Sequence, residues 1–307
     1  MYLARRLDKI APFHVMRVME AAQAQEATGR SVVHMEVGEP DFDTAKPILA
    51  AGQRALERQQ TKYTAAAGMP ILRQGIADYY ARRFNVRVPP DRILVTPGAS
   101  GALQLTMGLL LDPGDEILLT DPGYPCNRHL AMLVGATPKA LSVSAENGYQ
   151  PTPDQVRENW TDKTRALMLA SPSNPTGSVM QRQQFRDLQD CVQQLGVVMI
   201  VDEIYQGLVY GEEAWTVLQE SQAVIVINSF SKYFGMTGWR IGWMVAPEEA
   251  IPGLTRLAQN SYLAATTTSQ HAALVALSDE AIEIHEQRRE MFRQRRDYLA
   301  EAITDLG

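Results

Sequence analysis

The chain has 307 residues, 45% of them hydrophobic and 21% charged, so it can bury a core and is too apolar to stay disordered. Its formal net charge of −6 offers no basic field for nucleic acid or an anionic membrane. The longest apolar runs are the size of strands and far too short to span a bilayer. Cys126 and Cys191 lie far apart, which indicates neither a disulfide framework nor a metal site. With no apolar leader at the amino terminus, these features predict a soluble cytoplasmic protein, most simply an enzyme.

The first 11 residues are predicted to form a loose arm. From Pro12, apolar residues at helical spacing predict a helix that stops near Gly29. Its apolar stripe consists of Phe13, Met16, Met19 and Ala22. A short strand is expected at residues 32–37, followed by the turn-forming residues 38–41.

From about residue 47, short apolar runs alternate with amphipathic stretches such as residues 100–111 and 182–195. The predicted strands are residues 93–95, 116–120, 138–143, 166–170, 197–201, 224–228 and 241–245. Strands that are apolar on both faces are typical of a sheet covered by helices on each side. The sequence therefore predicts an α/β fold with a doubly wound, mostly parallel sheet.

After residue 247 the pattern predicts only helices, at residues 248–260, 269–277 and 279–306. In the last helix one core-facing stripe is expected. Its members are Ile284, Met291, Tyr298 and Ile303. Because the sequence stops at Gly307, nothing follows to cover this stripe, which suggests a missing element; the alternative is a helix that folds back on the large domain.

Five short motifs could carry chemistry, and four of them follow predicted strands, where α/β sheets bind ligands. The most unusual is the stretch 229–242, in which Lys232 lies among hydroxyls and Arg240 follows eight residues later. A lysine amine with a lowered pKa suits imine chemistry, and an arginine with serines suits a phosphate ester. The alternative is a solvated surface lysine.

At the end of the strand 197–201, Asp202 is either a helix cap or an anion that pairs with a buried cationic ring nitrogen, and Tyr205 would then face the same ligand. In residues 171–177, Asn174 could donate to a ligand oxygen, although Asn-Pro and Thr-Gly are also ordinary turn dipeptides. Residues 96–103 predict a strand, a turn and a helix whose first N–H groups attract phosphate. In residues 121–125, Tyr124 could stack on a planar ring or lie in a simple turn.

Taken in order, the motifs resemble those of the class I/II aminotransferases, which are fold-type I enzymes dependent on pyridoxal 5′-phosphate. The matching segments are residues 38–42, 62–64, 97–100, 121–125, 174–177, 202–205 and 229–242. The resemblance covers essentially the whole chain. It implies a fold-type I large domain and a small α/β domain. It also implies pyridoxal 5′-phosphate as cofactor, transfer of an amino group between an amino acid and a 2-oxo acid, and a homodimer.

The resemblance further implies a role for each matching residue. Lys232 would form the Schiff base with the cofactor aldehyde and then move protons, and Asp202 would keep the pyridine nitrogen protonated. Tyr205 and Asn174 would bond the ring 3′-oxygen, and Tyr124 would stack on the ring.

The remaining roles implied by the resemblance concern the phosphate, the substrate and the partner subunit. The phosphate would be held by Arg240, Ser229, Ser231, Ser100 and the Ala99 backbone N–H. Tyr63 would reach the cofactor phosphate of the neighbouring subunit. The Gly38 backbone would contact the substrate carboxylate, with Asn174 beside it. No metal site is expected.

The chain departs from the family pattern in two respects. The family normally continues past this length with a segment that carries an arginine for the substrate α-carboxylate, so we expect a C-terminally truncated chain whose turnover is impaired. The expected division is 1–45 as arm and part of the small domain, 46–280 as the large cofactor-binding domain, and 281–307 as the start of the rest of the small domain. Residues 262–268 contain no arginine for a second carboxylate, which disfavours a dicarboxylic substrate.

Three alternative functions share these motifs. A C–S β-lyase of the same fold would use the same cofactor residues. The ligand-sensing domain of a regulator normally follows a DNA-binding segment, whereas only a short arm precedes the fold in this sequence. A catalytically impaired cofactor-binding protein would bind the cofactor without exchanging the substrate Cα proton.

Overall fold

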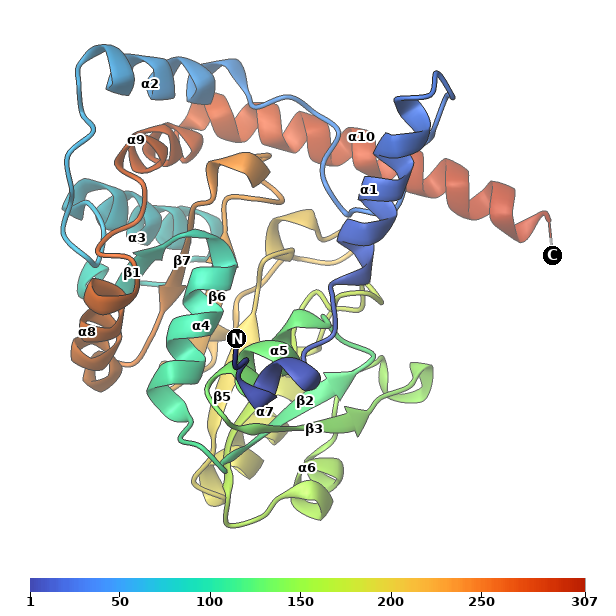
Figure 1. Ribbon diagram of the computed structural model, residues 1–307, viewed down its shortest axis with the longest axis vertical. Helices are drawn as coiled ribbons and strands as arrows, with labels where there is room; N and C mark the ends of the chain where they lie inside the picture. Colours follow the sequence, from blue (N-terminus) through green and yellow to red (C-terminus); the bar gives the residue numbers. More distant parts are fainter. Residues whose placement is uncertain (307) are drawn as a thin grey trace.

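The computed structural model describes residues 1–306, which form one seven-stranded sheet with helices on both faces (Figure 1). The strands are β1 (Ile93–Thr96), β2 (Glu116–Asp121), β3 (Thr137–Ser142), β4 (Thr164–Ala170), β5 (Val198–Asp202), β6 (Ile225–Ser229) and β7 (Gly242–Val245). Their spatial order is β1-β7-β6-β5-β4-β2-β3, and only β7 runs antiparallel to its neighbours. All seven predicted strands are confirmed, as is the mostly parallel sheet.

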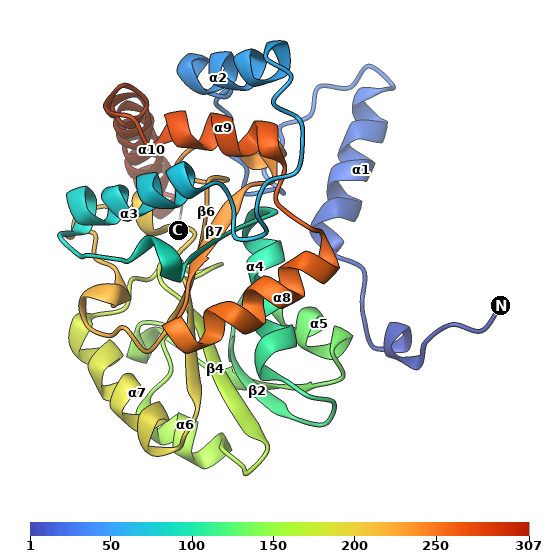
Figure 2. The same ribbon diagram turned by 90° about the vertical axis from the view of Figure 1, so that its left-hand side faces the viewer.

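Helices cover the two faces of the sheet in separate groups. The helices are α1 (His14–Glu26), α2 (Lys46–Glu57), α3 (Pro70–Phe84), α4 (Gly98–Leu110), α5 (Cys126–Leu133), α6 (Pro153–Asn159), α7 (Arg182–Gln194), α8 (Ile251–Ser261), α9 (Thr267–Ala276) and α10 (Asp279–Thr304). Figure 2 shows α4, α5 and α8 on one side of the strands and α3, α6 and α7 on the other. The doubly wound arrangement is thus confirmed.

Successive strand residues pack into two different cores because side chains alternate across a sheet. In β5, Met199 and Val201 pack with Phe185 of α7, whereas Ile200 between them packs with Leu103 of α4. All five side chains are buried, and each such burial contributes about 1.5–3 kcal/mol. Burial on both faces explains why the strands appear in the sequence as uninterrupted apolar runs.

The long helix α10 buries side chains only near its start, where Ala281 and His285 are buried. Ile284 lies against the core, but Met291, Tyr298 and Ile303 are 43%, 76% and 58% exposed. The expected core-facing stripe is therefore wrong beyond the first turns, since α10 extends past the sheet's helices (Figure 1). Gly307, the last residue of the expected domain segment 281–307, lies outside the described residues.

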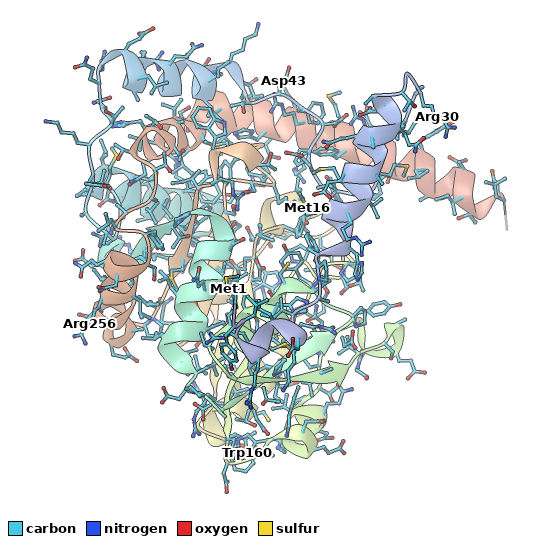
Figure 3. All side chains as sticks on the ribbon, viewed as in Figure 1. Met1, Met16, Arg30, Asp43, Trp160 and Arg256 are labelled. Atoms are coloured by element: carbon cyan, nitrogen blue, oxygen red, sulfur yellow. The ribbon has the colours of Figure 1, made fainter. Side chains whose placement is uncertain are left out.

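In the amino-terminal region one expectation, the helix, is confirmed, and another, the strand at residues 32–37, is corrected. The helix 14–26 forms, but none of its residues is buried, and Met16 on its stripe is exposed (Figure 3). Residues 32–37 form no strand because no strand lies beside them among the described residues. Instead His34 bonds two acids, with Nδ1 2.7 Å from Glu36 Oε1 and Nε2 3.1 Å from Glu26 Oε1.

Within residues 1–306, no helix is both long and apolar enough to cross a membrane. Over the same residues, no group of three or more His, Cys, Asp or Glu side chains is arranged to hold a metal ion.

Candidate functional site

The motif residues gather at the edge of the sheet where β4, β5 and β6 end. Asn174 follows β4, Asp202 ends β5, and Ser229 ends β6. The parallel pairing of these strands brings their carboxyl ends to one edge, which is where α/β sheets bind ligands. This sheet edge is the candidate active site.

One end of the site is a backbone cradle that only glycine permits. Gly98 begins α4 with a φ of +68°, and a Cβ on it would lie 2.7 Å from Arg240 Nη2. A Cβ on Gly242 would lie 2.8 Å from the carbonyl oxygen of Asn228 and 3.0 Å from the Ala99 nitrogen. The turn before α4 therefore packs directly against the loop that carries Arg240.

Two buried serines and one arginine complete this cradle. Ser229 Oγ donates to Ser231 Oγ at 3.0 Å, and the Ser231 N–H donates to Ser229 Oγ at 3.0 Å. The exposed Arg240 has a φ of +48° and donates from Nη1 to the Thr237 carbonyl at 3.0 Å, so part of its guanidinium remains available. A helix amino terminus, a guanidinium and hydroxyls together bind a phosphate dianion well, and a phosphate ester fits this cradle. Ser100, exposed in the first turn of α4, lies at its rim.

Asp202 is a buried carboxylate with little compensation. Its Oδ1 accepts one hydrogen bond, from the Ile204 N–H at 3.0 Å. Burial raises the pKa of Asp202 to about 6, while the Ile204 N–H and the Lys232 charge act in the opposite direction. The short turn after it is a 3₁₀ helix that begins at Gln206, so Asp202 is not an α-helix cap. A cationic ring nitrogen would supply the partner that this carboxylate lacks.

The Lys232 amine is half-buried and is held by the backbone of a distant segment. Its Nζ donates to the Gly38 carbonyl oxygen at 2.6 Å and lies 5.6 Å from the centre of the Tyr205 ring. Burial lowers the pKa of Lys232, Glu39 opposes that effect, and Arg240 lowers the pKa further. The alternative of a solvated surface lysine is therefore wrong.

Tyr124 and Asn174 line a cavity of about 150 Å³ beside β2 and β4. The ring of Phe13 meets the Tyr124 ring edge-on at 5.9 Å, so the residue before α1 reaches this site. Burial raises the pKa of the Tyr124 hydroxyl and of the Tyr205 hydroxyl, so both remain protonated donors at neutral pH. An aromatic ring with an amide and a phenol nearby suits a planar ligand that carries a polar oxygen.

The structure brings most of the candidate residues to one place, but Tyr63 stands apart. Tyr63 is 81% exposed, in the loop between α2 and α3. Gly38 lies close to the site: a Cβ on it would be 3.8 Å from the Tyr205 hydroxyl oxygen.

Motif reasoning missed two residues that support the site. Glu203 is 1% exposed and accepts from Thr216 Oγ1 and the Val217 N–H, both at 2.8 Å. Trp215 contacts the loops that follow β4 and β5. A second acid directly after a buried strand was a visible signal for Glu203, whereas a single tryptophan in a polar loop gave none for Trp215.

Comparisons with known proteins agree with this geometry. Residues 30–307 match the family described as aminotransferase class I and II. A (5-formylfuran-3-yl)methyl phosphate transaminase of Methanocaldococcus jannaschii is 36% identical over 99% of this chain and 80% of its own length. An aspartate aminotransferase of Geobacillus stearothermophilus is 32% identical over all of this chain and 79% of its own length.

Solved structures give the same result for the fold. A crystal structure of an aminotransferase from Mycobacterium tuberculosis has a TM-score of 0.95 at 32% identity, and covers 100% of this chain and 79% of its own. The aspartate aminotransferase of Thermus thermophilus with maleate has a TM-score of 0.94 at 32% identity, and covers 100% of this chain and 81% of its own.

Proposed function

This chain belongs to the class I and II aminotransferase family, and from that membership we propose which of its residues carry the reaction. It is a fold-type I enzyme that depends on pyridoxal 5′-phosphate and moves an amino group between an amino acid and a 2-oxo acid. The observation that supports the assignment of roles is the convergence of a desolvated amine, a buried carboxyl and a phosphate cradle at one sheet edge.

When bound, the cofactor supplies an aldehyde that condenses with amines and a protonated ring that accepts electrons from the substrate Cα. Lys232 Nζ is the amine placed to react with that aldehyde. Because burial lowers its pKa, more of it is the free base needed for nucleophilic attack. Once freed from the aldehyde, the same nitrogen would serve as the base that takes the substrate Cα proton and delivers it to C4′, the former aldehyde carbon of the cofactor.

Asp202 holds a proton on the ring nitrogen of the cofactor. A buried carboxylate about 4 Å from a cation gains about 4 kcal/mol at an effective dielectric constant near 20. That gain also explains why the chain retains a carboxyl whose burial is otherwise unfavourable.

The other site residues bind and orient the cofactor. The phosphate is held by Arg240, Ser229, Ser231, Ser100 and the Ala99 N–H. Tyr124 stacks on the ring, and Asn174 and Tyr205 donate to its 3′-oxygen. The Gly38 backbone, with Asn174, contacts the substrate carboxylate.

Larger-scale features belong to the same proposal. The protein is a homodimer in which Tyr63 of one subunit reaches the cofactor phosphate of the other. Residues 46–280 form the cofactor-binding domain, and residues 1–45 belong with residues 281–307. An ion pair between the two terminal segments supports that grouping: Arg295 Nη1 lies 2.8 Å from Asp41 Oδ1 and 2.9 Å from Asp41 Oδ2. A cytoplasmic location is supported by two free cysteines.

Replacing the reactive lysine tests the assignment. Lys232→Ala should bind pyridoxal 5′-phosphate weakly through the phosphate cradle, and borohydride should then trap no cofactor on the protein, as judged by mass spectrometry. Lys163→Ala, which removes an exposed lysine directly before β4, is the control and should be trapped like the wild type. A trapped adduct on Lys232→Ala would contradict the assignment.

A further inference from the structure

We propose that Trp215 is a positioning residue that holds the loops bearing Asn174 and Tyr205 at a fixed distance from each other. The inference rests on the proposed function, in which both residues donate to the 3′-oxygen of the cofactor. Trp215 lies in the loop between β5 and β6 and is placed to act through these two neighbouring loops.

The indole of Trp215 fixes the loop that bears Asn174. Its Nε1 donates to the Met180 carbonyl oxygen at 3.1 Å. Met180 closes that loop, since its N–H donates to Ser171 Oγ at 3.0 Å. The Ser171 N–H in turn donates to the Asp202 carbonyl at 3.0 Å. The loop is therefore fastened at its start to β5 and at its end to the indole.

The backbone of Trp215 fixes the loop that bears Tyr205. Gln206 is 2% exposed, and its Nε2 donates to the Trp215 carbonyl oxygen at 2.7 Å. The Gln206 N–H donates to the Glu203 carbonyl at 2.9 Å. Because Gln206 directly follows Tyr205, this bond restrains the backbone from which the phenol projects.

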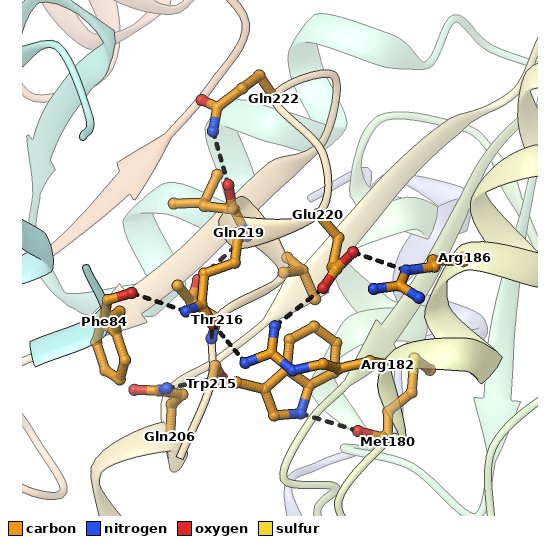
Figure 4. Close-up of polar contacts among 12 residues, drawn as sticks. Phe84, Met180, Arg182, Arg186, Gln206, Trp215, Thr216, Gln219, Glu220 and Gln222 are labelled. Carbon is orange, nitrogen blue, oxygen red and sulfur yellow. Dashed lines mark hydrogen bonds and ion pairs between the residues drawn. The ribbon is translucent and has the colours of Figure 1, made fainter. Parts of the chain in front are cut away.

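Trp215 is itself held in place by side chains of α7 and by the residues that directly follow Trp215 in the chain (Figure 4). The Arg182 guanidinium lies 5.0 Å from the centre of the indole ring, and the Phe185 ring meets it edge-on at 6.0 Å. Arg182 Nη1 pairs with Glu220 Oε1 at 2.9 Å, which fixes the guanidinium over the ring. The two bonds that Glu203 accepts from Thr216 and Val217 hold the next residues in place.

A relaxed loop would weaken donation to the 3′-oxygen. Donors near that oxygen stabilise its negative charge and so make the neighbouring nitrogen of Lys232 easier to deprotonate. Weaker donation therefore raises the apparent pKa that is read from the absorbance of the bound cofactor. A merely structural tryptophan would change stability without moving this pKa.

The experiment is an absorbance-monitored pH titration of the cofactor-loaded protein. Trp215→Phe removes the indole N–H but keeps a ring for Arg182 and Phe185. We expect it to raise the apparent pKa by about half a unit to one unit, which is a three- to tenfold change in proton affinity. Trp160→Phe is the matched control, because Trp160 directly follows α6 and its Nε1 has no hydrogen-bond partner among the described residues; it should titrate like the wild type.

Double variants identify the loop through which each bond acts. In an Asn174→Ala background the effect of Trp215→Phe should vanish, whereas in a Tyr205→Phe background it should persist. Gln206→Met removes the bond from Gln206 Nε2 to the Trp215 carbonyl oxygen. Its effect on the apparent pKa should vanish in a Tyr205→Phe background and persist in an Asn174→Ala background.

Three results would overturn the inference. The inference is contradicted if Trp215→Phe has the same apparent pKa as the wild type. It is also contradicted if Trp215→Phe shifts the apparent pKa equally in the presence and absence of Asn174. Failure of the wild type to acquire the visible absorbance of the cofactor would overturn the proposed function, and with it this inference, so the two failures are distinguishable.

Discussion

Two adjacent acids at the end of β5 have opposite surroundings. The Asp202 carboxylate accepts one hydrogen bond, from the Ile204 N–H. The Glu203 carboxylate accepts two, from the Thr216 hydroxyl and the Val217 N–H. Burial raises the pKa of Asp202 to about 6 and that of Glu203 to about 8, and Asp202 adds to the effect on Glu203. Only Asp202 lacks a full set of partners, so only Asp202 is poised for a ligand cation.

His285 gives a residue-scale prediction for acid stability. It is 1% exposed between the rings of Tyr233 and Phe234, with neither ring nitrogen bonded. Burial, and then the Arg288 charge, lower its pKa from 6.5 to about 4, although Glu286 opposes them. Between these two pKa values His285 is protonated in the unfolded chain but neutral in the folded chain. The free energy of unfolding therefore falls as the pH decreases from about 6.5 to 4.

Between pH 6.5 and 4, protonation of His285 in the unfolded chain is expected to lower the free energy of unfolding by about 3 kcal/mol. Urea denaturation of wild type and His285→Leu at several pH values between 7 and 4 measures it. The variant should lose less stability on acidification. Parallel pH dependence in the two proteins would contradict the assignment to His285.

At the scale of elements, α10 is connected to the loop that carries Lys232 through one carboxylate. Glu286 Oε1 accepts from the Tyr233 hydroxyl at 2.6 Å and pairs with Arg83 at 2.9 Å, while its Oε2 pairs with Arg289 at 2.7 Å. Tyr233 directly follows Lys232, so Glu286 joins α3, α10 and the lysine loop. This junction explains why α10 is packed in its first half.

Glu286→Ala should lower the free energy of unfolding by about 1–3 kcal/mol, because it leaves the Tyr233 hydroxyl and the Arg83 guanidinium without their partner. Denaturation in urea measures the loss. Glu290→Ala is the control on the same helix; its partner Arg293 is exposed, so its removal should change stability little. Equal losses in the two variants would show that the junction has no special role.

Sequence reasoning succeeded where one local rule decides the outcome. The seven strands were predictable because burial on both faces leaves uninterrupted apolar runs, and the site motifs because they follow strand ends. The strand predicted at residues 32–37 was wrong, because a short apolar run cannot show whether a neighbouring strand exists to pair with it. The Trp215 contacts with Met180 and Gln206 join segments that only the folded chain brings together.

At the scale of the whole molecule, the segment before α1 carries several exposed apolar side chains. Met1, Tyr2, Leu3 and Leu7 precede α1, and they are 111%, 83%, 57% and 50% exposed. These exposed apolar side chains, and the separately exposed Tyr63, support the proposed homodimer, because a dimer interface would remove apolar area from water.

Light scattering should therefore give twice the chain mass of 34.1 kDa. A mixing experiment tests whether sites are shared. Lys232→Ala and Tyr63→Ala proteins, each impaired alone, should regain intact cofactor sites when their subunits are exchanged, to about a quarter of all sites. No recovery in a mixture whose subunits have exchanged would show that Tyr63 serves its own subunit or none.

The reversed direction of β7 has a mechanical consequence. Gly242 at its start pairs both with Ser229, which ends β6, and with Thr96, which ends β1. The stretch that carries Lys232 thus leaves the sheet at the end of β6 and re-enters it beside that same end, at the start of β7, which pairs with both β6 and the edge strand β1. Moving its two ends apart would require breaking the pairing of β7 with β6. The segment around Gly38, whose carbonyl oxygen accepts from Lys232 Nζ, lies outside the sheet, so it faces the lysine without being held by strand pairing.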